Sequence, residues 1–119
     1  MRFKLAVAVA ALALAPLAHA ADHGNPKAKE LMQKSGCFAC HAVDHKVVGP
    51  AYAWVAARYK NDKKTVKMLA EKVIKGGAGN WNKWTGGIPM SPNPGLSMKQ
   101  AEEAVHWILA QKPVKAPNP

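Results

Sequence analysis

Apolar residues recur at helical spacing in four stretches of this chain, and polar or chain-breaking residues separate these stretches. Positions i, i+3 and i+4 share one face of a helix, so this spacing is typical of helices that bury one side. The pattern predicts helices at residues 26–34, 51–60, 63–75 and 98–111. No stretch shows the alternation of a β-strand, and no segment repeats. We therefore expect a single all-α domain.

Residues that favour helix ends flank these stretches. Asn25 precedes Pro26, which suits an N-cap followed by proline at the first helical position. Gly76 follows the third stretch, where a glycine at C′ is expected. Ser97 and Gln100 have the spacing of a capping box at the start of the last helix. The helix ends are thus predicted independently of the apolar spacing.

Residues 77–95 show no apolar period and are rich in Gly, Pro, Asn and Trp. A loop of this length within a compact domain is usually functional. Prolines at positions 89, 92 and 94 restrict the backbone, so we expect an ordered path. The short C-terminal tail at 117–119 is instead expected to be frayed and disordered.

The chain begins with the pattern of a secretory signal peptide. Basic residues precede an apolar run, which ends at the cleavage site Ala18-His19-Ala20. The run is short and alanine-rich for a membrane span, and a retained anchor is the alternative. The sequence predicts a signal peptide at 1–20 and one mature domain at 21–119, with its core at about 26–113.

The chain is strongly basic, with a net charge of +10. Cleavage after residue 20 removes Arg2 and Lys4 and no acidic residue, which leaves +8. Such an excess favours acidic partner surfaces and accelerates encounter with them. The lysines are spread out and form no block, which argues against nucleic acid. We expect a monomer that contacts acidic proteins transiently and, after cleavage, does not insert stably into a membrane.

Candidate chemistry is concentrated at Cys37-Phe38-Ala39-Cys40-His41. Cys-x-x-Cys-His is the attachment signature of c-type haem, in which two thiols bond one porphyrin and the histidine binds its iron. A disulfide here would close only a small loop, and a zinc site would need more ligands. A thioredoxin-like pair would need a βαβ context. The sequence predicts one haem c on Cys37 and Cys40, with His41 as an iron ligand, attached in the periplasm.

Met90 is the candidate for the second iron ligand. It follows His41 by 49 residues, far enough to reach the opposite face of the ring, and prolines stiffen its loop. The other methionines of the mature chain fit packing or surface positions: Met32, Met68 and Met98. The rival ligands are histidines, none of them as well placed: His23, His45 and His106.

Three segments together resemble small bacterial class I cytochromes c of the c551/c552 (c8) type. They are Gly36 to His41, Val48-Gly49-Pro50-Ala51-Tyr52, and Ile88-Pro89-Met90-Ser91-Pro92-Asn93. The resemblance covers nearly the whole mature chain. It implies the class I cytochrome c fold, in which four main helices surround one covalently attached haem and a long loop carries the methionine ligand.

The resemblance also implies roles for individual residues. Pro50 would pack near His41, whose ring N–H would donate to a backbone carbonyl there. Asn93 would donate toward the sulfur of Met90. Trp84 would reach a haem propionate, although the stretch from Asn80 to Gly87 is longer than the single-tryptophan version, so Trp81 is a second candidate. Two further implied roles are a helix-crossing core that contains Trp107 and Met32, and a charge near the propionates from Lys72.

These features favour a soluble one-electron carrier over an enzyme. With His41 and Met90 both bound, no substrate would reach the iron, and the iron would only cycle between two oxidation states. Lysines near the motifs are the candidates for contact with acidic redox partners: Lys34, Lys46 and Lys83. The alternatives are a haem enzyme or ligand-binding protein with an open iron site, and an interaction module without haem.

Overall fold

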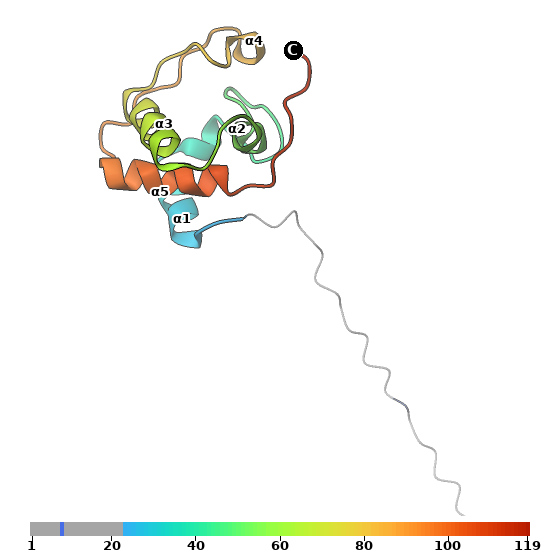
Figure 1. The fold of residues 1–119 in the computed structure, drawn as a ribbon, viewed down its shortest axis with the longest axis vertical. Helices are drawn as coiled ribbons and strands as arrows, with labels where there is room; N and C mark the ends of the chain where they lie inside the picture. The colour runs from blue at the N-terminus through green and yellow to red at the C-terminus, as the bar shows by residue number, and fades with distance from the viewer. Residues whose placement is uncertain (1–7, 9–22) are drawn as a thin grey trace, which may run out of the picture.

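The computed structural model describes residue 8 and residues 23–119. Its elements are α1 (Pro26–Lys34), the 3-10 helix η1 (Cys37–Ala39), α2 (Tyr52–Arg58), α3 (Lys63–Lys75), α4 (Asn82–Thr85) and α5 (Met98–Leu109) (Figure 1). Within the described residues, β-pairing is limited to isolated bridges, His41 with Lys46 and Gly77 with Met90. The prediction of an all-α fold is confirmed.

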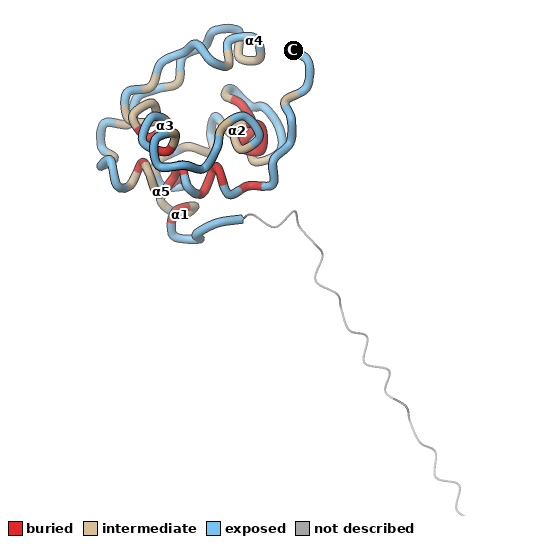
Figure 2. The backbone as a smooth tube through the Cα atoms, in the orientation of Figure 1, coloured by how far each residue is buried: buried red, intermediate tan, exposed pale blue. Residues whose placement is uncertain are grey.

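Helix α5 is the centre of the packing, because α1, α2 and α3 all pack against it (Figure 1). One buried cluster joins α5 to α1 and α2, and its members are Ala28, Met32, Tyr52, Ala104, Trp107 and Ile108. A second cluster joins α5 to α3, and its members are Val66, Ala70, Ala101, Val105 and Leu109. Figure 2 shows the buried residues gathered along α5 and the inner sides of these helices. The expected contact between Trp107 and Met32 lies in the first cluster.

The predicted starts of α1 and α5 are present. The side chain of Asn25 accepts a hydrogen bond from the Lys27 amide at 2.9 Å, and Pro26 begins α1. Ser97 and Gln100 form a reciprocal capping box, with hydrogen bonds of 3.1 and 3.0 Å. These caps satisfy amides that a helix start leaves unpaired.

The structure differs from the predicted elements at several places. Helix α5 ends at Leu109, before the predicted end at 111, and η1 was not among the predicted helices. Helix α2 ends at Arg58 because Tyr59 is extended, with φ −117° and ψ 142°, so it is shorter than the predicted 51–60. The loop at 77–95 contains α4, which spans Asn82–Thr85 and is too short to have an apolar period. None of these differences moves a helix of the core.

The structure describes the C-terminal segment in full but little of the N-terminal one. The predicted signal peptide at 1–20 and its cleavage site lie outside the described residues, apart from residue 8. At the other end, we expected residues 117–119 to fray, but the carbonyl of Pro117 accepts a hydrogen bond from Trp84 Nε1 at 2.7 Å. Just before them, the amide of Val114 donates to the Ala53 carbonyl at 3.1 Å. Among the residues that the structure describes, no helix is long and apolar enough to cross a membrane.

Candidate functional site

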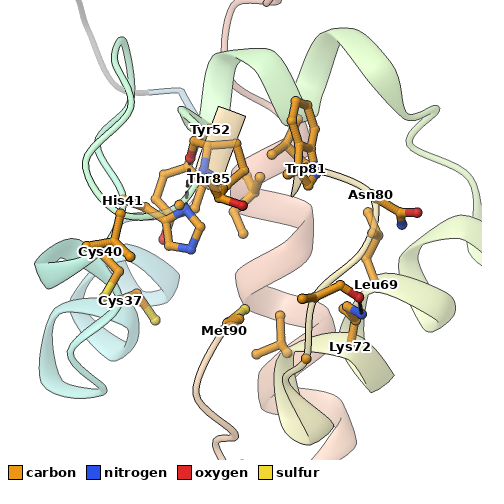
Figure 3. A pocket seen from close by; sticks show the side chains of 18 of the residues that line it. Cys37, Cys40, His41, Tyr52, Leu69, Lys72, Asn80, Trp81, Thr85 and Met90 are labelled. Carbon is orange, nitrogen blue, oxygen red and sulfur yellow. Dashed lines mark hydrogen bonds between the residues drawn. The ribbon is translucent and has the colours of Figure 1, made fainter. Parts of the chain in front are cut away.

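A cavity of about 300 Å³ lies between the motif turn, α3, α5 and the segment that contains α4 and Met90. Figure 3 shows Cys37, Cys40 and His41 on one side of it, and Leu69, Lys72 and Asn80 on the other. Apolar side chains form much of the wall, among them Val55, Leu69, Val73, Ile88 and Ile108. The Cys-x-x-Cys-His motif and the predicted Met90 loop therefore meet at one apolar cavity.

The motif turn places its three reactive side chains on the same side. Gly36 is left-handed, with φ 78°, and it turns the chain sharply after α1. The amides of Cys40 and His41 both donate to the Cys37 carbonyl, at 3.2 and 3.1 Å, which closes the turn. Both cysteines line the cavity and neither forms a disulfide. Burial raises the pKa of the Cys37 thiol.

His41 is held so that one ring nitrogen remains available. Its Nδ1 lies 2.8 Å from the carbonyl oxygen of Pro50, and because that oxygen can only accept, Nδ1 carries the proton. The ring stacks on Tyr52, with centroids 4.9 Å apart, and a Cβ added at Gly49 would collide with it. Burial lowers the pKa of His41, which favours the neutral ring. Nε2 therefore keeps a lone pair suited to a metal ion.

Met90 is held by its own backbone on a separate segment. Its amide donates to the Gly77 carbonyl at 2.8 Å, and its carbonyl accepts from the Gly77 amide at 2.9 Å. Met90 is partly buried and lines the cavity, into which its side chain points in Figure 3. Met32 also borders the cavity, but it is a core side chain, 1% exposed. Met68 and Met98 are exposed.

The other histidines in the described part of the chain lie elsewhere. His45 is exposed and pairs with Asp44, and His106 bonds the side chain of Asn61. The backbone amide and carbonyl of His23 bond the side chain of Gln111. None of these three lines the cavity. The geometry therefore brings together His41 and Met90, the two residues predicted as metal ligands.

The sequence profile described as Cytochrome c matches residues 26–112. The chain belongs to the cytochrome c family. A cytochrome c-551 of Allochromatium vinosum is 46% identical over 79 residues, which are 66% of this chain and 80% of that protein. A cytochrome c-552 of Hydrogenobacter thermophilus is 42% identical over 84 residues, 71% of this chain and 81% of that protein.

The structural comparison agrees with this assignment. The crystal structure of wild-type Nitrosomonas europaea cytochrome c552 superposes with a TM-score of 0.60 at 41% identity, covering 68% of this chain and 95% of that one. The predicted resemblance to small class I cytochromes of the c551/c552 type is thereby confirmed, as is the class I fold. Cytochromes of this family are electron carriers with one covalently bound haem c.

The residues present fit that haem. Two unpaired thiols lie at the Cys-x-x-Cys spacing beside an apolar cavity, and a neutral imidazole with a free Nε2 follows them. Gly49 has no side chain beside the His41 imidazole, and any larger residue would fill that space. Haem c supplies an iron that exchanges one electron, and Cys37 and Cys40, which fit the Cys-x-x-Cys-His motif, would hold it covalently.

The side chains of Asn93 and Lys72 bond backbone carbonyls in the structure. Nδ2 of Asn93 donates to the carbonyls of Val73 and Ser91, at 3.1 and 3.3 Å, and the Met90 sulfur is not among its partners. Lys72 lines the cavity as expected, but its Nζ donates to the Ala78 carbonyl at 3.3 Å. Asn93 thus attaches the Met90 loop to α3.

The two tryptophans of the 77–95 loop have separate positions. Trp81 lines the cavity, whereas Nε1 of Trp84 donates to the carbonyl of Pro117 at 2.7 Å. Sequence reasoning left both open and favoured Trp84 for the contact with a propionate. It also missed Gly77 as the partner of Met90 and Tyr52 as the partner of the His41 ring. The Gly76-Gly77 pair after an apolar helix was the sequence signal that could have indicated the pairing of Gly77 with Met90.

Proposed function

We propose that this cytochrome is a periplasmic one-electron carrier whose haem iron is bound by His41 and Met90. The observation that carries the proposal is the meeting of these residues at one cavity, each held by backbone groups. A thioether is a weak ligand, so the two backbone hydrogen bonds that hold Met90 to Gly77 lower the entropy cost of binding. A Met/His pair raises the reduction potential relative to a bis-His pair.

With His41 and Met90 in these roles, the chain leaves no coordination position for a substrate. His41 keeps its orientation through Pro50 and Tyr52, and Met90 keeps its own through Gly77. Ligands that move little between two oxidation states suit rapid electron transfer. These contacts favour a carrier over an enzyme with an open iron.

The surface supports transient contact with acidic redox proteins. Near the cavity mouth, Val48 and Ile88 line the cavity and are 39% and 58% exposed. The predicted contact lysines are all exposed, and Lys34 pairs with Glu30 at 3.0 Å. Exposed apolar residues at the cavity, together with exposed lysines and a positive net charge, suit short-lived complexes of small area. The signal-like residues 1–20 are the basis for placing the carrier in the periplasm.

The test is replacement of the proposed ligand, Met90→Ala, in the haem-loaded protein. We expect loss of the far-red absorption band of Met-ligated ferric iron and binding of cyanide or CO at the freed position. The matched control is Met68→Ala, because Met68 is 48% exposed on α3 and does not line the cavity. Retention of the band in Met90→Ala would refute the proposed ligand pair.

A further inference from the structure

The C-terminal segment 113–119 lies beyond residues 26–112, which match the family, yet it makes specific contacts. After α5 it passes α2, where the Val114 amide donates to the Ala53 carbonyl at 3.1 Å. It then reaches α4, where the Pro117 carbonyl accepts from Trp84 Nε1 at 2.7 Å. Figure 1 shows this segment leaving α5, passing beside α2 and ending near α4.

Helix α4 has little packing of its own. It spans Asn82–Thr85, contains no buried residue, and none of the other described helices packs against it. Figure 2 shows the segment around it as exposed or intermediate. Glycines with positive φ flank it on both sides: Gly77, Gly79, Gly86 and Gly87. A helix this short does not hold its shape in water without tertiary contacts.

The beginning of the α4 segment is attached to α2. The guanidinium of Arg58 lies 4.8 Å from the centre of the Trp81 ring and donates to the Asn80 carbonyl. Nδ2 of Asn80 donates to the hydroxyl of Tyr59 at 3.2 Å. These contacts hold Asn80 and Trp81 where they line the cavity.

The far side of α4 is attached through Trp84 to the tail. The indole N–H has a backbone carbonyl as its partner, 33 residues away in the sequence. Pro113, Pro117 and Pro119 lower the conformational freedom of the unbound tail, so binding costs less entropy. An aromatic side chain that meets a carbonyl of a proline-rich segment is a recurring mode of peptide recognition.

We propose that residues 113–119 form a strap that binds Trp84 and holds α4 against the cavity. Thr85 and Trp81 line that cavity, so release of the strap allows the α4 segment to open and admits water to the haem side. Solvent exposure is one of the properties that set a haem potential. The effect on the haem potential rests on the proposed function. The contact between Trp84 and Pro117 is independent of which residues bind the iron.

Amide hydrogen exchange in the haem-loaded protein tests the strap. Truncation after Ala116 removes the Pro117 carbonyl, and Trp84→Phe removes the donor but keeps an aromatic ring. In both variants we expect exchange at residues 81–87 to accelerate about tenfold, as for the loss of one hydrogen bond that closes a local unit. Truncation after Asn118 is the matched control, because it shortens the tail and leaves Pro117 in place; its exchange should equal that of the full chain.

Two comparisons make the result decisive. Amides of α5 in the same sample report global unfolding, so their exchange should be unchanged in every variant. Combining the truncation with Trp84→Phe should accelerate exchange no more than either change alone, because both break the same contact. Unchanged exchange at 81–87 in the truncated chain, or additive effects, would overturn the strap. The Met90→Ala spectrum tests the ligand pair separately, so either proposal can fail without the other.

Discussion

At the scale of single residues, small or rigid neighbours decide how His41 is presented. Pro50 offers its carbonyl at 2.8 Å, and Gly49 lies so close to the ring that a Cβ would collide with it. The φ of Gly49 is not in the left-handed region, so space and not backbone freedom requires glycine here. The orientation of the proposed iron ligand therefore depends on the absence of one carbon atom next to it.

Gly49→Ala tests this close approach. We expect the added methyl to displace the imidazole and to lower the free energy of unfolding by about 1–3 kcal/mol, the usual cost of overpacking. The measurements are denaturant unfolding and the absorption spectrum of the haem-loaded protein. The control is Gly95→Ala, because a Cβ at Gly95 meets nothing within 4 Å and its φ is not positive. Equal stability of the two variants would contradict the steric argument.

At the scale of elements, the end of α3 positions the Met90 loop. Gly76 has φ 69° and ψ −158°, a conformation that other residues rarely adopt, and it directs the chain away from α3. The Met90 and Pro92 backbone lies directly against it. Asn93 then makes two hydrogen bonds to α3. Its backbone N–H donates to the Ile74 carbonyl, and its side-chain Nδ2 donates to the Val73 carbonyl. The C-terminal end of α3 therefore positions Met90, the proposed iron ligand.

Gly76→Ala separates contact from backbone strain. Strain at this φ and ψ costs about 1–3 kcal/mol, and the new Cβ also pushes on the Met90 carbonyl. We expect lower stability together with a weakened far-red band. Gly86→Ala is the control, since Gly86 has φ 67° but a Cβ there meets nothing within 4 Å. It should lose stability and keep the band; loss of the band in both variants would argue against a specific contact.

At the scale of the whole molecule, charge and shape act together. The chain from residue 21 onward has a net charge of +8, and α1 and α4 lie at opposite ends of the fold (Figure 1). A partner that approaches the cavity past α4 therefore meets Lys83 and is far from the start of α1. Charges close to a contact surface change association rates more than distant charges do.

Lys83→Glu in α4 and Lys27→Glu in α1 make the same change of net charge at these two ends. With an acidic redox protein as partner, we expect Lys83→Glu to slow second-order electron transfer about severalfold more than Lys27→Glu at low ionic strength. The difference should shrink as salt screens the charges. Stopped-flow rates over a range of salt concentrations provide the measurement. Equal slowing would indicate that only total charge matters.

Local patterns were enough for much of this protein. Apolar spacing predicted α1, α3 and α5, and capping residues predicted the starts of α1 and α5 and the end of α3, because both depend on neighbours within one or two turns. The attachment motif and its haem are equally local, since a short turn sets the reach of the two thiols. Even the pairing of His41 with Pro50 followed from the resemblance of nearby segments.

Tertiary structure alone decided the features that link distant segments. Helix α4 has no period to detect, and it depends on Arg58 and Pro117 for its contacts. The tail was expected to fray because no local pattern stabilises it, and its partners lie on α2 and α4. Likewise Asn93 bonds to α3, and Trp81 rather than Trp84 borders the cavity. A polar group bonds whichever partner the packed chain brings within reach, and sequence spacing does not specify that partner.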